Sequence, residues 1–187
     1  MQICLLIDTP NLEPLEPILD ALEGQPIRAW IAPAAFISLG PSVVHHLRLA
    51  GFDSYLDLRL TGEATSVGRA VEAVRRQGAL GVTVDLTAGL AVAKAAVAAA
   101  KGRLKIVGVP GSLDAPAPSP DALETARHAG IRLLYTAEPH AAAIDGFQLF
   151  VRTDAPTGTA AGAVIGDRLL DAADPGSACD ALLTELS

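Results

Sequence analysis

Eight short apolar runs alternate with helical patterns along these 187 residues, and this rhythm limits the possible folds more than any other property of the sequence. The runs are rich in Val, Ile and Leu and are bounded by Gly, Pro or charged residues, which is typical of buried parallel strands. They lie at Ile3–Asp8, Ile27–Ala32, Ser54–Leu60, Gly81–Leu86, Leu104–Val109, Arg132–Thr136, Phe147–Arg152 and Ala163–Gly166. Eight strands with crossover connections suit a closed barrel, so we expect the α/β class and a (β/α)8 TIM barrel, with residues 1–187 as one domain.

Four connecting segments have the start and stop signals of helices. One begins at Pro41 and ends at Gly51, and a second carries an apolar stripe through Val67, Val71 and Val74 before Gly78. A third covers Leu90–Lys101 before Gly102, and a fourth has Ser119 as its cap, Pro120 as its first residue and Gly130 as its end. These helices match crossovers between parallel strands.

The connection between the seventh and eighth strands is too short for a helix. It spans only Thr153–Gly162 and contains Pro156 and Gly158. The whole chain is also shorter than the roughly 200–250 residues usual for this fold. We therefore expect a barrel with a shortened connection between strands seven and eight.

Composition and charge exclude several classes of function. Half of the residues are hydrophobic, yet no apolar run approaches the roughly 18 residues that cross a bilayer, and Met1–Asp8 has no secretory-signal pattern. Fourteen basic residues against twenty-one acidic ones give a net charge of -7, without a basic cluster that would follow a phosphate backbone. Only Cys4 and Cys179 are present, so no disulfide framework or cysteine metal site is indicated. We expect a soluble cytoplasmic protein with neither nucleic acid nor membrane as a partner.

Polar residues follow the predicted strands, where a β/α barrel builds its active site from the loops at the C-terminal ends. They are Asp8, Asp57 with Arg59, Asp85, Ser112 with Asp114, Glu138, and Asp167 with Arg168. Asp114, Glu138 and Asp167, each taken singly, are better explained as caps of the following helices. Asp8 and Asp57 end apolar runs, where an ionised carboxylate needs a cation or hydrogen-bond donors, and these two we interpret as site residues.

Several of these segments resemble the orotidine 5'-phosphate decarboxylase family. They are Cys4–Pro10, Ser38–Pro41, Gly51–Leu60, Val82–Asp85, Gly111–Asp114 and Gly166–Pro175. They occur in the order in which the family places its strand-end motifs and cover nearly the whole chain. The resemblance implies a dimeric β/α barrel without metal or organic cofactor, in which a Lys-Asp-Lys-Asp charge network drives loss of carbon dioxide from a pyrimidine nucleotide.

The sequence departs from that family at the charge network. The first network lysine corresponds to Ala32, and the Asp-x-Lys-x-x-Asp motif reads Asp57 to Gly62, with Arg59 at its lysine. A guanidinium with a pKa above about 12 is a poorer acid than an ammonium. Glu63 is a possible substitute for the carboxylate lost at Gly62, which the family's partner subunit contributes.

The family's phosphate contacts also differ. Its loop after the seventh strand is truncated here, and its Gly-Arg motif reads Gly166-Asp167, which would repel a phosphate dianion unless Arg168 or Arg152 offset the charge. Asp8 resembles the family's ribose contact, and Ser112 resembles its pyrimidine contact. Nucleotide binding in the family's manner is therefore not expected, and the ligand is expected to be a nucleoside-like, nucleotide-like or other small molecule.

The leading hypothesis is a decarboxylase-like barrel with a diverged reaction centre, weak or inactive in the ancestral reaction. It assigns Asp57 and Arg59 to the reaction centre, and assigns ligand contacts to Asp8, Glu63, Asp85, Ser112 and Arg168. It requires no metal and no cofactor, and it predicts a homodimer and a small-molecule ligand. Two alternatives stay open: a non-catalytic binding or scaffold protein, and a divalent-metal-dependent lyase that uses the carboxylates. His140 is the histidine nearest the predicted mouth. It is either an acid or base for the reaction or an ordinary loop residue.

Overall fold

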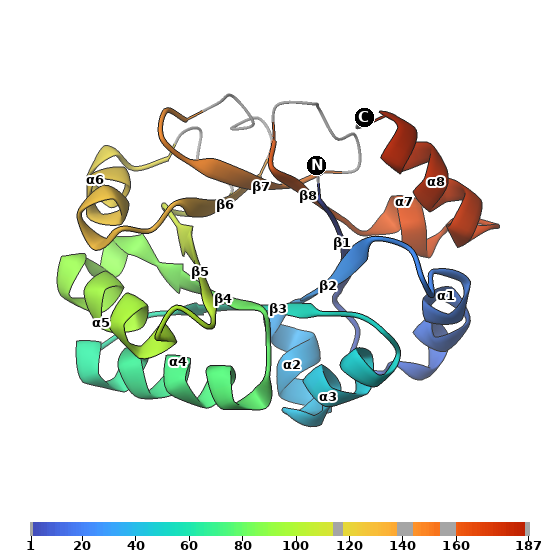
Figure 1. Cartoon of the computed structure of the whole chain (residues 1–187), viewed down its shortest axis with the longest axis horizontal. Helices are drawn as coiled ribbons and strands as arrows, with labels where there is room; N and C mark the ends of the chain where they lie inside the picture. The colour runs from blue at the N-terminus through green and yellow to red at the C-terminus, as the bar shows by residue number, and fades with distance from the viewer. Residues whose placement is uncertain (1, 114–117, 138–143, 154–159, 186–187) are drawn as a thin grey trace.

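A closed barrel of eight parallel strands forms the centre of the molecule in the computed structural model, which describes residues 2–113, 118–137, 144–153 and 160–185. The strands are neighbours in chain order, and the last pairs with the first (Figure 1). They are β1 (Gln2–Ile7), β2 (Ile27–Ile31), β3 (Ser54–Leu60), β4 (Gly81–Asp85), β5 (Lys105–Val109), β6 (Leu133–Ala137), β7 (Gln148–Arg152) and β8 (Gly162–Ile165). The predicted TIM barrel is confirmed, with strand ends within one residue of the expected positions.

Helices lie outside this ring along its left, lower and right sides in Figure 1. They are α1 (Glu16–Ala21), α2 (Pro33–Leu39), α3 (Ser42–Leu49), α4 (Ala64–Gln77), α5 (Leu90–Ala100), α6 (Pro120–Ala129), α7 (Asp167–Leu170) and α8 (Pro175–Glu185), with short 3-10 turns at Glu13–Leu15 and Leu86–Ala88. Gly78 and Gly130 end α4 and α6 in the left-handed conformation, and the Ser119 hydroxyl accepts the Ala122 N–H at the start of α6. Among the described residues, none of these helices has the length and apolarity to cross a membrane.

Two connections are short, whereas the sequence pattern indicated one. Residues 153–161 join β7 to β8, as expected, and residues 138–147 join β6 to β7. No helix lies in the described parts of either connection, 144–147 in one and 153 with 160–161 in the other. The expected short connection between strands seven and eight was based partly on Pro156 and Gly158, and these two residues lie outside the described residues. The small size of this barrel therefore arises from two neighbouring connections.

Alternating strand residues divide the core into two apolar clusters. Outward-facing residues such as Ile3, Leu5 and Ile7 of β1 pack with the helices in the larger cluster. Inward-facing residues form a separate cluster that fills the lumen: Cys4, Leu6, Trp30, Ala32, Tyr55, Val107, Val109, Leu113, Tyr135, Phe150 and Val164. The strict period of two in the sequence thus becomes a physical separation between the lumen and the helix layer.

Four aromatic rings occupy the lumen below the mouth. The Trp30 ring centroid lies 5.2 Å from that of Tyr55, 4.5 Å from Tyr135 and 5.4 Å from Phe150. All four side chains are at most 3% exposed. Since these rings leave no open channel through the barrel, a ligand must bind above them, at the C-terminal ends of the strands.

Two glycines make room for these rings. A Cβ added at Gly81 would lie 2.6 Å from Tyr55 Cδ1, and one added at Gly162 would overlap the Phe150 ring. Real side-chain carbons do not approach so closely, so the strands pass the rings only because these two positions carry no side chain.

Replacing Gly162 with alanine is expected to lower the free energy of unfolding by about 1–3 kcal/mol, because the added methyl overpacks the lumen. The matched control is Gly68→Ala in α4, where the nearest atom to an added Cβ is the Ala95 carbonyl oxygen at 3.8 Å. That control should be neutral or stabilising by up to about 1 kcal/mol, because alanine is the better helix former. Urea unfolding of both variants measures the difference, and equal stabilities would contradict the packing argument.

Candidate functional site

Polar residues continue the inward-facing positions of several strands beyond the aromatic layer. Asp57 follows Tyr55 on β3, Asp85 follows Thr83 on β4, and Arg152 follows Phe150 on β7, each two residues further toward the mouth. The Tyr135 phenol senses the charges of these groups. Burial raises its pKa, the Asp57 carboxylate raises this pKa further, and the Arg152 and Arg59 guanidinium groups lower it. The charges of β3 and β7 therefore act on one shared space above the lumen.

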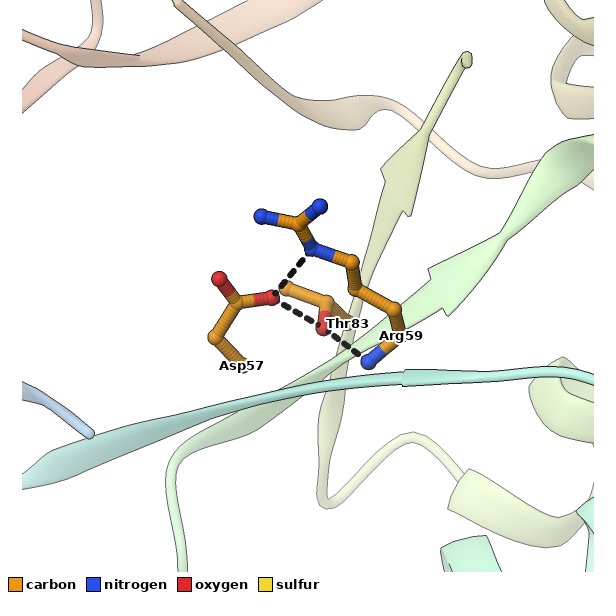
Figure 2. Close-up of polar contacts among 3 residues, drawn as sticks. All are labelled: Asp57, Arg59 and Thr83. Carbon is orange, nitrogen blue, oxygen red and sulfur yellow. Dashed lines mark hydrogen bonds and ion pairs between the residues drawn. The ribbon is translucent and has the colours of Figure 1, made fainter. Parts of the chain in front are cut away.

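A compact network joins Asp57, Thr83 and Arg59 (Figure 2). Asp57 is 3% exposed, although it carries a carboxylate. The Thr83 hydroxyl donates to Asp57 Oδ1 at 2.8 Å, and Arg59 Nε lies 3.4 Å from the same oxygen. Thr83 Oγ1 also accepts the backbone N–H of Arg59 at 2.7 Å. The buried carboxylate thus has both a hydroxyl donor and a cationic neighbour, which offset the cost of its desolvation.

Arg59 has an unusual backbone for a residue with a side chain. Its φ is 43°, in the left-handed region, which costs roughly 1–2 kcal/mol for a non-glycine residue. The pairing of β3 with β4 shifts register between Leu56 and Leu60, so a bulge surrounds this position. Strain of this kind persists only where neighbouring contacts hold it, and here the bond from the Arg59 N–H to Thr83 does so.

A second polar region lies between the ends of β1, β7 and β8. A cavity of roughly 250 Å³ is lined there by Leu6, Asp8, Thr9, Leu15, Arg152, Gly166, Asp167 and Leu170. Asp8 is exposed, so the expectation of a desolvated carboxylate at this position is wrong: the buried strand β1 stops at Ile7 and the chain emerges into solvent. Arg168 follows Asp167, but its guanidinium pairs with the Glu185 carboxylate of α8 at 2.5 Å and 3.0 Å. Part of its positive charge is therefore already balanced by Glu185.

Asp85 has a local structural role, whereas the Glu63 side chain makes no hydrogen bond to the helix that it precedes. Asp85 Oδ1 accepts the backbone N–H of Thr87 at 2.8 Å and its hydroxyl at 2.6 Å, so this carboxylate caps the 3-10 turn after β4. Glu63 precedes α4 as an exposed residue and its side chain caps nothing. Gly62 beside it has a φ of 111°, which a residue with a side chain rarely adopts.

Ser112 borders a very small space. The hollow that it shares with Pro110, Gly111, Leu113, Pro118 and residues 135–137 measures about 10 Å³, roughly one water-sized sphere. Thr136, one of its lining residues, is 3% exposed, and its hydroxyl has no hydrogen-bond partner among the described residues. Asp114, Glu138 and His140, which the sequence places nearby, lie outside the described residues.

Ala32 occupies the position that corresponds to the first network lysine of the family that the sequence resembles. It is 6% exposed and forms the N-cap of α2, directly after β2. Its methyl group supplies no charge to Asp57. In the described part of the chain, no three side chains of His, Cys, Asp or Glu gather closely enough to hold one metal ion.

The structure thus brings Asp57 and Arg59 together and adds Thr83, which the sequence analysis did not single out. The signal for Thr83 was present, because it lies two residues before Asp85 on the inward face of a strand. Asp8 and Arg152 border the cavity between the ends of β1, β7 and β8, whereas the Arg168 guanidinium pairs with Glu185.

Fold and site together define a (β/α)8 barrel protein with a charged site at the C-terminal ends of its strands. Comparison with known proteins places it near orotidine 5'-phosphate decarboxylases. The enzyme of that name from Halorhodospira halophila is 31% identical over 111 residues, which cover 58% of this chain and 47% of that protein. The one from Saccharophagus degradans is 30% identical over 101 residues, covering 54% and 42%. No family model matches the chain.

Solved structures agree over a longer stretch. An uncharacterized conserved protein from Geobacillus kaustophilus superimposes with a TM-score of 0.86 at 21% identity, covering 99% of this chain and 100% of that one. Orotidine 5'-phosphate decarboxylase from Lactobacillus acidophilus gives 0.82 at 19% identity, covering 100% and 99%. The resemblance to this family is confirmed in sequence and in fold, while the chain spans about half the length of the curated relatives it matches.

Proposed function

We propose that this protein is an orotidine 5'-phosphate decarboxylase-like barrel that binds a nucleoside-like small molecule at its mouth and is weak or inactive in decarboxylation. Asp57 and Arg59 form its reaction centre, and Asp8 and Ser112 border the ligand. As in the family it resembles, the working form is a homodimer.

The observation that carries this proposal is the environment of Asp57. A guanidinium and a hydroxyl are its neighbours, at 3.4 Å and 2.8 Å, where the resembled family has ammonium groups. An arginine keeps its proton at any physiological pH and is therefore a poor donor to a carbanion. Ala32 and Gly62 add neither the second cation nor the second anion of the family's network.

A direct assay of decarboxylation tests the catalytic half of the proposal. Purified protein given orotidine 5'-phosphate should turn over far more slowly than the roughly 1–1000 per second of ordinary enzymes. The Asp57→Asn variant, which keeps the side-chain shape, measures the background from contaminating enzyme. A wild-type rate within the ordinary range, abolished in Asp57→Asn, would overturn the proposal.

The ligand half predicts a preference for nucleosides over nucleotides. Asp8 and Asp167 face the same cavity as Arg152, so a phosphate dianion there meets two carboxylates and one cation. In a thermal-shift series, uridine and orotidine should raise the melting temperature more than their monophosphates do, since binding stabilises by mass action. A larger shift with the monophosphates would contradict it, and Asp167→Arg should reverse the order by supplying a phosphate partner.

A non-catalytic binding or scaffold protein is the second candidate. The hollow at Ser112 holds about one water, which is too small for a pyrimidine ring without movement of its walls. If no nucleoside or nucleotide shifts the melting temperature, this candidate replaces the first.

A further inference from the structure

We propose that the outer edge of the Arg59 guanidinium is a binding fork for the carboxylate of a small ligand. This inference rests on the proposed function, because it names the chemical group that the mouth recognises. It goes beyond that function because Arg59 becomes a binding and specificity-determining residue in addition to a counter-charge for Asp57.

The guanidinium is held at one edge only. Its Nε lies 3.4 Å from Asp57 Oδ1, and its two terminal nitrogens lie on the other side of the group (Figure 2). Neither terminal nitrogen has a hydrogen-bond or ion-pair partner among the described residues, and the side chain is 40% exposed. A guanidinium fixed at Nε presents two parallel N–H donors, which match the two oxygens of a carboxylate.

The backbone of Arg59 supports a positioned side chain. Only two non-glycine residues of the described chain have a positive φ, Arg59 and Lys101. Lys101 caps the C-terminal end of α5, where the left-handed conformation is routine. Arg59 is inside a strand at a register shift, where glycine would remove the strain at no steric cost. A strained residue at the mouth of a barrel is the usual sign of a side chain aimed for a function.

The surrounding charges favour a carboxylate over a phosphate. Asp57 already neutralises part of the Arg59 charge, so the pair together attracts a monoanion more readily than a dianion. Asp8 and Asp167 in the neighbouring cavity further disfavour a doubly charged group.

Matched pairs of ligands isolate the carboxylate. Orotate and uracil share one ring and differ in the carboxylate, and calorimetric titration of the whole protein should give orotate the higher affinity, by roughly tenfold to a hundredfold for two charge-assisted bonds. Inorganic phosphate is the third probe and should bind more weakly than orotate. Equal affinity for orotate and uracil, or tighter binding of phosphate, would overturn the inference.

Arg59→Lys separates recognition from structure. The lysine keeps a cation beside Asp57 but has no fork, so the melting temperature should stay within a few degrees while the preference for orotate over uracil is lost. Arg69→Lys on the exposed face of α4 is the matched control and should keep that preference. An unchanged preference in Arg59→Lys would contradict the assignment.

The proposed function and this inference fail differently. Binding of uridine and uracil without any advantage for orotate leaves the nucleoside proposal standing and removes the fork. If neither orotate nor any nucleoside binds, both are wrong.

Discussion

Thr83→Val lowers the free energy of unfolding by about 2–4 kcal/mol, the largest effect that we expect from a single isosteric change. The substitution removes the hydroxyl that donates to the buried Asp57 carboxylate at 2.8 Å and accepts the Arg59 N–H at 2.7 Å. A buried charged group that loses a donor costs more than the roughly 1–3 kcal/mol of a neutral one, and the backbone N–H loses its acceptor as well. Urea unfolding with an unchanged m-value would measure this difference.

Thr136→Val is the matched control for that change. Thr136 is also a buried strand threonine, but its hydroxyl has no partner among the described residues. Valine there should leave the free energy of unfolding unchanged or raise it by up to about 1 kcal/mol, because a buried unpaired hydroxyl is removed. Thr83→Ser, which keeps the hydroxyl, should recover most of the lost stability. If the two valine variants were equally stable, the network around Asp57 would contribute nothing.

Alkaline pH is expected to destabilise the barrel from about pH 9 upward. Burial raises the pKa of the Cys4 thiol from 9.0 to about 12 and that of the Tyr55 phenol from 10.0 to about 12. Burial raises the pKa of Tyr135 as well. Well below pH 9 these groups are protonated in both states, so their contribution to stability is fully present. Between about pH 9 and 12 the unfolded chain releases protons that the folded barrel retains, and unfolding becomes more favourable as the pH rises.

The Cys4 thiol alone corresponds to a loss of up to about 4 kcal/mol at pH 12, at about 1.4 kcal/mol for each pKa unit. Melting temperatures measured from pH 7 to 11.5 should fall steeply above pH 9. Tyr55→Phe keeps the ring in the lumen and removes one ionisable group, so its curve should be less steep than the wild-type curve above pH 10. A wild-type melting temperature that stays constant to pH 11 would show that these groups titrate as freely as in the unfolded chain.

The barrel was predictable because the sequence patterns of its strands and helices are local and are repeated along the chain. Each strand is a short apolar run, and helices begin at residues such as Ser119 with Pro120 and end at glycines such as Gly78 and Gly130. Eight repeats of strand and connection leave few topologies. The sequence analysis missed several helices, among them α1 and α2, which have only six and seven residues, and α8, which follows a polar segment. Such patterns are weak.

The sequence by itself determined that Asp57 and Arg59 lie two residues apart on one strand and that no lysine stands at Ala32, because strand periodicity fixes which side chains share a face. Tertiary structure alone decided that Thr83 completes the network, that Arg168 pairs with Glu185, and that Asp8 is exposed. These outcomes depend on contacts between residues 17 to 26 positions apart, or on where a strand meets solvent. Local propensity carries no information about such distances, since they are set by the closure of the barrel and by the packing of α8 against it.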